Sequence, residues 1–400
     1  MAQAAKKLCP TLHCLLKRQS PQRLHSVKLR DLLHGCKHNC QYQPARCMGI
    51  LGFSKPSEWN KVVSDAERIV GYPTSFLSLR CLLSDELSNV ALQMRKLVGT
   101  KHPLLQTAKD LIYDGKHGLQ TRGLIVLLLS KAAGPAPGMD VTEHDLVSGI
   151  FPSQRSLAEI TEIIHTANLI HKGVVNMADL SPNDGLPADM EFGNKMAVLS
   201  GDFLLASACT GLAELGNTKV VELIAGAIGD LMEAEFTGFT DRQGNPTLPA
   251  AVTFSDWVKQ TYLQSGSLLA KSCRAAMKLA SHSSDMQQMA YDYGLNTAYV
   301  QQLSEDVKTF TKGEHSEVRV TSAPVILLQE QHPDTAELVL RQGKSDTKQL
   351  LTAVQGSGVL TECRRLCDEY STKAVGALAA FRNSDAKSAL VNMVHAIRRV

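Results

Sequence analysis

The stretch EIIHTANLIHKGVVN, residues Glu162–Asn176, has the pattern of a helix that packs one face into a core. Its apolar residues recur at spacings of three and four, and two histidines, His165 and His171, lie on the same stripe. The turn that follows, Lys172–Asn176, contains one cation, a glycine, two valines and an amide. The sequence therefore predicts a helix over residues 154–175 that ends without an acidic group.

Helical patterns also fill the rest of the chain after the first 54 residues. Apolar residues make up 44% of the chain and aromatic residues only 5%, so the core must consist mainly of Leu, Val, Ile and Ala. Such a composition favours helix over strand. The sequence shows no alternating strand pattern, no glycine-rich phosphate loop and no repeat of fixed period. We expect one all-α domain of about a dozen helices over residues 55–400, including helices at 142–150, 190–214 and 252–282.

Residues 1–54 differ from the rest of the chain in charge. They contain nine Lys and Arg residues and a single acid, Asp31, so their net charge is +8. Because the whole chain carries +3, residues 55–400 carry −5, which is unlike a nucleic-acid-binding protein. A basic, acid-poor segment rich in Leu, Ser and Gln is typical of a mitochondrial transit peptide, and we expect the protein in the mitochondrial matrix. The alternative is a disordered basic arm that binds RNA or acidic lipid.

Cysteine and hydropathy patterns exclude two further classes of protein. Half of the ten cysteines lie in residues 1–54, and the motif HGCKHNC (His34–Cys40) has no second ligand pair at zinc-finger spacing. No metal site is therefore expected there. The chain has no run of about 20 uncharged apolar residues, so no transmembrane segment is predicted.

The segment EFGNKMAVLSGDFLLASA, residues Glu191–Ala208, is apolar nearly all round the expected helix. A helix without a polar face is buried in a large core or in a contact between subunits. The amount of apolar surface makes a subunit interface a serious alternative to a monomer core. The candidate interface residues are Phe192, Met196, Leu199, Phe203 and Leu205.

Three long motifs together resemble the signatures of the trans-polyprenyl diphosphate synthases in order and spacing. They are Glu162–Asn176, FGNKMAVLSGDFLLASA (Phe192–Ala208) and YGLNTAYVQQLSEDVKTF (Tyr293–Phe310). The segment SAPVIL (Ser322–Leu327) resembles the family's segment after the third signature. The resemblance covers nearly all of residues 58–400 and implies an isoprenoid-synthase-type helical bundle.

The resemblance also implies a chemistry. In this family an allylic diphosphate ionises to a carbocation and pyrophosphate, and isopentenyl diphosphate adds to the cation, so the chain grows by five carbons. Two Asp-Asp-x-x-Asp motifs on facing helices hold the Mg²⁺ ions that stabilise the leaving pyrophosphate. The first and last Asp of each motif share one helix face, and carboxylate oxygens are ligands that Mg²⁺ prefers.

This sequence departs from both acidic motifs. The aspartate positions of the first motif fall on Lys172, Gly173 and Asn176, and those of the second fall on Glu305, Asp306 and Thr309. Lys172 either replaces a metal ion at a diphosphate or is a solvated lysine at a helix C-terminus, where its charge suits the helix dipole. The two remaining acids either bind one Mg²⁺ weakly or form a solvated acidic turn. We expect no catalytic residue and no metal ligand on this chain.

The cations that hold diphosphate in the family are mostly missing too. In GLQTRG (Gly118–Gly123) only Arg122 survives, and it either binds a phosphate or pairs with an acid. The family's Lys-Thr pair appears as Gln264-Ser265, and the arginine pair that follows the first motif is absent. His165 and His171 are expected to be packing histidines, since a general base needs a reaction nearby.

The resemblance therefore implies a non-catalytic but required subunit of a heteromeric all-trans-polyprenyl diphosphate synthase, which makes the isoprenoid side chain of ubiquinone. It implies a heterotetramer with a catalytic subunit that carries the Mg²⁺ and receives the prenyl diphosphate substrates. Two alternatives remain open. One is a weak stand-alone prenyltransferase, and the other is an all-α regulator or scaffold that binds prenyl lipids or proteins.

Overall fold

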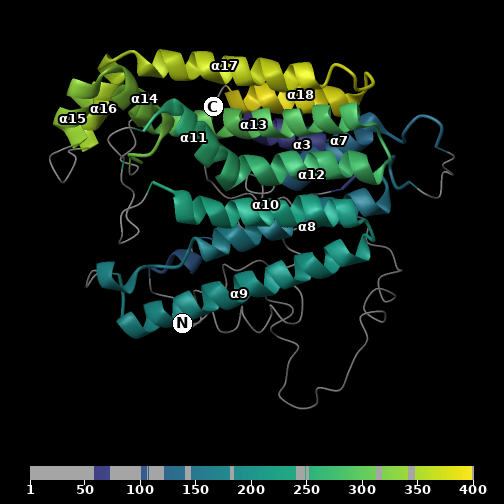
Figure 1. Ribbon diagram of the computed structural model, residues 1–400, viewed down its shortest axis with the longest axis horizontal. Helices are drawn as coiled ribbons and strands as arrows, with labels where there is room; N and C mark the ends of the chain where they lie inside the picture. Colours follow the sequence, from purple (N-terminus) through teal and green to yellow (C-terminus); the bar gives the residue numbers. More distant parts are fainter. Residues whose placement is uncertain are drawn as a thin grey trace, which may run out of the picture. The chain divides into compact units, whose positions relative to one another are not determined.

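The computed structural model describes residues 58–72, 101–105, 107, 121–139, 146–180, 184–239, 248, 252–311, 318–340 and 347–398. All of them belong to one compact unit, Lys55–Val400 (Figure 1). The expected leader at residues 1–54 and the cysteine motif within it lie outside the described residues, so both remain predictions.

Every regular element in the described residues is a helix, and the prediction of an all-α fold is confirmed. The elements are α3 (Glu58–Val70), α7 (Thr121–Ala133), α8 (Pro152–His171), the 3₁₀ turn η4 (Met177–Asp179), α9 (Pro187–Glu214), α10 (Thr218–Thr237), α11 (Phe254–Thr261), the π-helix η5 (Tyr262–Gly266), α12 (Ser267–Leu279), α13 (Ser284–Thr311), α14 (Ala323–Gln331), α15 (Pro333–Leu340), α16 (Thr347–Gly356), α17 (Val359–Ala377) and α18 (Asp385–Arg398).

The helix expected at 142–150 is wrong in its described part. Residues 146–150 form a tight turn closed by an isolated bridge between Val147 and Ile150. Ser148 and Gly149 have φ values of 56° and 81°, in the left-handed region. A right-handed helix cannot continue through two such residues.

The centre of the bundle is α7, in which every residue except Lys131 is buried. It packs against α3, α8, α12 and α18. A second apolar cluster surrounds the C-terminal half of α13 and includes Trp257, Tyr299 and Phe310. A third, smaller cluster lies under the N-terminal half of α9 and is made by Leu104, Ala167, Ile170, Ala197 and Leu204.

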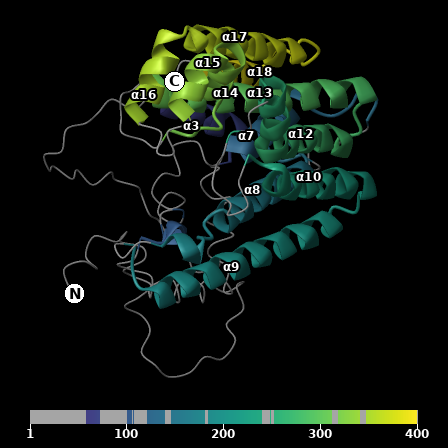
Figure 2. The ribbon, with the colours of Figure 1, turned by 60° about the vertical axis from the view of Figure 1, so that its left-hand side comes forward.

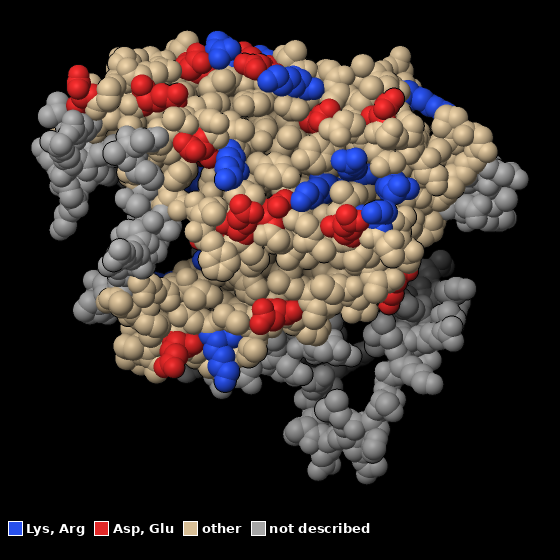
Figure 3. All heavy atoms as spheres, in the orientation of Figure 1, with Lys and Arg blue, Asp and Glu red and all other residues tan. Residues whose placement is uncertain are grey.

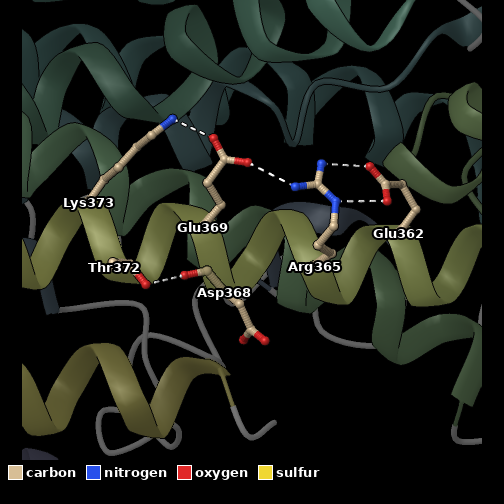
Figure 4. Close-up of polar contacts among 6 residues, drawn as sticks. All are labelled: Glu362, Arg365, Asp368, Glu369, Thr372 and Lys373. Atoms are coloured by element: carbon tan, nitrogen blue, oxygen red, sulfur yellow. Dashed lines mark hydrogen bonds and ion pairs between the residues drawn. The ribbon is translucent and has the colours of Figure 1, made fainter.

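Helices α17 and α9 lie on opposite sides of the bundle. Figures 1 and 2 both show α17 at one margin and α9 at the other, where α9 packs along α8 and touches α10 only slightly. The solvent face of α17 carries a ladder of ion pairs in which Arg365 bonds Glu362 twice, at 2.8 and 2.9 Å, and Glu369 once, at 3.3 Å (Figure 4). Charges of both signs line this margin in Figure 3. Such exposed pairs add little stability but keep the helix face in water.

Candidate functional site

The helix that leads to the first motif ends before the motif begins. Helix α8 stops at His171, so the predicted end at residue 175 is too late. Lys172 is the C-cap, and the amides of Gly173 and Val174 bond the carbonyls of Ile170 and His171 in a tight turn. The two ends of the motif, four residues apart, therefore do not share a helix face as the metal-binding geometry requires.

The three motif positions have separate environments. Lys172 is exposed, and its Nζ lies 3.5 Å from Oε1 of Glu235 on α10. Gly173 is buried, and a Cβ there would lie 3.1 Å from the Ile170 carbonyl oxygen and 3.5 Å from the Leu104 amide nitrogen. The Asn176 side chain accepts a 3.2 Å hydrogen bond from the amide of Ala178, and Asn176 is thereby the N-cap of η4. This turn supplies no carboxylate for a metal cluster.

In the second motif, the one retained aspartate is fully engaged in hydrogen bonds. Asp306 is only 2% exposed. Its oxygens accept hydrogen bonds from Trp257 Nε1 (3.0 Å), Gln302 Nε2 (2.9 Å), an Arg319 guanidinium nitrogen (2.7 Å) and the Ala323 amide (2.8 Å). Burial raises the pKa of Asp306, and the four donors act in the opposite direction. Asp306 thus ties α13 to α11 and to the start of α14.

The expectation of a solvated acidic turn is therefore wrong for Asp306. The other two positions differ from it, since Glu305 is exposed and Thr309 is half-buried. Among the described residues, no group of three or more His, Cys, Asp or Glu side chains could hold a metal ion. Mg²⁺ needs several oxygen ligands with vacant lone pairs, so these two motifs do not fit it.

Arg122 lies inside the bundle, in the first turn of α7. The residue is only 9% exposed, and its guanidinium donates a 2.9 Å hydrogen bond to Nε2 of His165 on α8. Burial lowers the pKa of Arg122, and the charges of Glu162 and Glu305 oppose this change. Burial also lowers the pKa of His165, with Arg122 and Lys172 adding to the effect. The neutral imidazole accepts the bond, as its geometry requires.

Glu162 joins α8 to the N-terminus of α7. Its Oε1 accepts a 2.7 Å hydrogen bond from the amide of Gly123, so the carboxylate faces the positive end of the helix dipole. Its Oε2 has no hydrogen-bond partner among the described residues. Burial raises the pKa of Glu162 to about 7, against the effect of Gly123 and of Arg122. The structure thus places Arg122 in a buried polar cluster with Glu162 and His165.

A cavity of about 170 Å³ lies between the ends of α10 and α11, η5 and α13. Its only charged lining residue among those described is Glu235, the partner of Lys172. The side-chain nitrogens of Gln260 and Gln302 donate hydrogen bonds to the Ala234 carbonyl and to Asp306, respectively. Their side-chain oxygens are acceptors. A cavity whose one charged lining residue, among those described, is an acid is poorly suited to a diphosphate.

The position of the family's lysine also lines this cavity, as Gln264. Gln264 and Ser265 lie in η5, a π-helical turn of the kind that often occurs at functional sites. The backbone irregularity is therefore present although the cation is not.

The predicted interface residues lie on α9 as expected, at two depths. Leu199 is 50% exposed, whereas Phe192, Met196, Phe203 and Leu205 are half-buried against the small core under α9. Of the eight large hydrophobic side chains exposed among the described residues, five lie between residues 174 and 199. Exposed apolar surface is thus concentrated on α9 and the segment before it. Among the described residues α9 is also the one helix long and apolar enough to cross a membrane, although a third of that window is buried.

Several residues of the site were not foreseen in the sequence. Trp257 and Arg319 bond Asp306 from 49 and 13 residues away, and Asn194 contacts the first-motif turn from α9. Trp257 is one of only two tryptophans in the sequence, and this rarity was the one sequence feature that could have drawn attention to it. A buried indole normally finds an acceptor for its N–H.

Comparisons with known proteins agree with the motifs. The polyprenyl synthetase family matches residues 102–323. The rat protein named all trans-polyprenyl-diphosphate synthase PDSS2 is 49% identical over 356 residues, covering 86% of this chain and 88% of the relative. Solanesyl-diphosphate synthase 1, mitochondrial, of Oryza sativa is 32% identical, covering 78% and 74%. The apo form of an Arabidopsis medium/long-chain length prenyl pyrophosphate synthase superposes with a TM-score of 0.55 at 29% identity, covering 79% and 97%.

Proposed function

Because the chain belongs to the polyprenyl synthetase family, we propose that it is a non-catalytic, required subunit of a heteromeric all-trans-polyprenyl diphosphate synthase. The synthase would make the isoprenoid side chain of ubiquinone. Family and fold agree with the expectations from the three motifs. The assignment of a non-catalytic role rests on the residues of the two acidic motifs.

The observation that carries this proposal is the first-motif turn. None of Lys172, Gly173 and Asn176 is an acid, and α8 has ended before them. Mg²⁺ supplies several kcal/mol of transition-state stabilisation when it polarises a leaving phosphate oxygen. Each loss of about 1.4 kcal/mol costs tenfold in rate, so a chain without this cluster loses many orders of magnitude. The Mg²⁺ of the complex would be held by the catalytic subunit.

A partner chain gives the exposed face of α9 a role. Large apolar side chains exposed together on one helix often mark a protein–protein contact. Val198 and Leu199 are exposed there, with the half-buried aromatic residues Phe192 and Phe203 behind them. The partner we propose is the catalytic subunit, in a heterotetramer of two chains of each type. A scaffold without a synthase partner would use the same face, but family membership favours a synthase subunit as the partner.

The location we propose is the mitochondrial matrix. It is supported by the basic, acid-poor composition of residues 1–54 and by the mitochondrial name of the rice relative. Cleavage of the leader is expected to leave a mature chain with a net negative charge.

The test is reconstitution with a catalytic polyprenyl diphosphate synthase subunit from the same organism. Each chain is expressed alone and together, and products are measured with farnesyl diphosphate, isopentenyl diphosphate and Mg²⁺. We expect co-purification, and long-chain product that needs both chains. A catalytic subunit that is equally active without this chain, or that does not bind it, would overturn the proposal.

A further inference from the structure

The N-terminal half of α9 is held by polar contacts with the first-motif turn. The side-chain amide of Asn194 bonds both peptide groups of Val175. Its Oδ1 accepts from the Val175 amide at 2.8 Å, and its Nδ2 donates to the Val175 carbonyl at 2.8 Å. A side chain that satisfies one residue's donor and acceptor together fixes both distance and direction.

A second contact reaches the same amide from the segment before α7. Oδ1 of Asn194 also accepts a 3.1 Å hydrogen bond from Nε2 of His102, whose Nδ1 accepts from the Leu104 amide at 3.1 Å. The imidazole lies where a side chain at residue 193 would be, so only Gly193 allows this approach. Three segments far apart in the sequence therefore meet at Asn194.

The end of α8 makes a similar contact two turns further along α9. The imidazole of His171 packs on Gly201, where any side chain would overlap it. Its Nε2 lies 3.3 Å from the Val198 carbonyl oxygen and 3.3 Å from a carboxylate oxygen of Asp202.

The fully buried face of α9 presents few large side chains to α8, although half-buried ones such as Phe192 and Phe203 flank it. This face contains Gly193, Ala197, Ser200 and Gly201 in succession, with large side chains at either end. Small residues allow close approach but supply few side chains that interdigitate with the neighbouring helix. A slip of one residue moves a helix by about 1.5 Å, which is enough to break both bonds to Val175.

We propose that the first-motif turn, Lys172–Asn176, positions α9 for the partner subunit, and that Asn194 is the positioning residue. The inference rests on the proposed function, because it assumes that the outer face of α9 is the docking surface. The turn that would hold metal in an active synthase thereby gains a function in assembly. Asn194 touches no substrate, so its effect would appear in affinity for the partner and not in turnover of the assembled enzyme.

The test uses Asn194→Ala, with Asn296→Ala as a matched control. Asn296 is also a half-buried helical asparagine, but among the described residues its side chain bonds only the Asp292 carbonyl of its own helix. We expect half-maximal activation of the catalytic subunit to require about tenfold more of the Asn194→Ala chain than of the wild-type chain. Maximal turnover should stay within twofold of wild type. Asn296→Ala is expected to leave both quantities unchanged.

Hydrogen exchange of the isolated chain gives a second readout that needs no partner. The Val175 amide should exchange at least tenfold faster in Asn194→Ala than in wild type, while amides of α7 are unchanged. Asn194→Asp keeps the acceptor and removes the donor, so it should fall between the two, and it replaces the alanine variant if that variant does not fold.

The outcomes separate the two proposals. Normal activation by both Asn194 variants overturns the inference while the proposed function stands. Lower maximal turnover at saturating chain also overturns it, because positioning would then not be confined to assembly. Faster Val175 exchange in a chain that binds no synthase subunit at all overturns the proposed function instead.

Discussion

The two acidic motifs of this chain differ from a metal-binding pair in different physical ways. At the first motif no position carries an acid. Lys172 is exposed, Gly173 is buried against backbone, and α8 ends before both of them. At the second motif Asp306 remains, but four donors occupy its carboxylate. The comparison teaches that the presence of an acid in a sequence motif does not measure its availability to a metal.

The difference also predicts how each motif responds to substitution. Asp306 of the second motif is part of the core, so replacing it should affect stability. The first motif has become a tight turn, so restoring acids there should disturb packing without creating a metal site.

The largest expected effect is at Asp306. Asp306→Ala leaves the Trp257 indole, the Ala323 amide and the Arg319 guanidinium without their acceptor. Removing one partner of a buried ionic network costs about 3–5 kcal/mol, measured as the free energy of unfolding in urea. Glu305→Ala, an exposed neighbour, should change it by less than about 0.5 kcal/mol. Equal effects of the two substitutions would show that Asp306 is not the structural acid.

A smaller loss is expected when an acid returns to the first motif. Gly173→Asp places a carboxylate against the Ile170 carbonyl and the Leu104 backbone, which should cost about 2–4 kcal/mol of unfolding free energy. Lys172→Asp at the exposed neighbouring position should cost less than about 1 kcal/mol. Titration calorimetry with Mg²⁺ should detect no binding to either variant. A stable Gly173→Asp chain that binds Mg²⁺ would contradict our account of this turn.

The cluster behind the first motif should respond to pH through Glu162. Its pKa is about 7 in the folded chain against an ordinary 4.5, so between these values the folded chain holds a proton that the unfolded chain has released. The stability that Glu162 contributes is therefore present below pH 4.5 and lost as the pH rises through 7. His165, whose pKa is lowered, gives the opposite slope below pH 6.5.

Glu162→Gln isolates the glutamate contribution because Gln retains an acceptor for the Gly123 amide. The unfolding free energy of wild type minus that of Glu162→Gln should fall by about 2–3 kcal/mol between pH 5 and pH 8. Urea unfolding across this range measures it. A difference that is independent of pH would mean that Glu162 does not titrate near neutrality.

The smallest effect concerns the exposed face of α9. Leu199→Asp should weaken assembly with the catalytic subunit at least tenfold, about 1.4 kcal/mol, without changing the stability of the isolated chain. Val147→Asp is a matched control, because Val147 is 49% exposed but lies far from α9 in the sequence and outside any helix. Analytical ultracentrifugation of mixtures provides the measurement. Equal weakening by both variants would remove the case for α9.

Sequence patterns predicted the features of the fold that depend on neighbouring residues. The helix expected at 190–214 is observed as Pro187–Glu214, and the one at 252–282 as α11, η5 and α12 in succession. Both segments are long runs of mostly helix-favouring residues without an internal proline, which neighbouring residues alone reveal. The turn at 146–150 was missed because Ser148 adopts a left-handed conformation that its residue type rarely takes.

The state of the site depended on contacts that no local pattern contains. The turn that follows α8 is held by Asn194, which bonds Val175 from 19 residues further along the chain. Gly173 in the same turn packs against the backbone of Leu104. The burial of Asp306 requires Trp257 and Arg319 to converge on it from separate helices and turns. The sequence could therefore identify the missing acids, but not the structural role of Asp306.

The measurement that tests the central claim most directly is prenyl elongation by the isolated chain. Purified protein, freed of host synthases, is incubated with farnesyl diphosphate, radiolabelled isopentenyl diphosphate and Mg²⁺, at enzyme in excess of substrate. We predict no labelled polyprenyl product beyond that of a heat-denatured control. Elongation that depends on Mg²⁺ and follows this chain through every purification step would contradict the account.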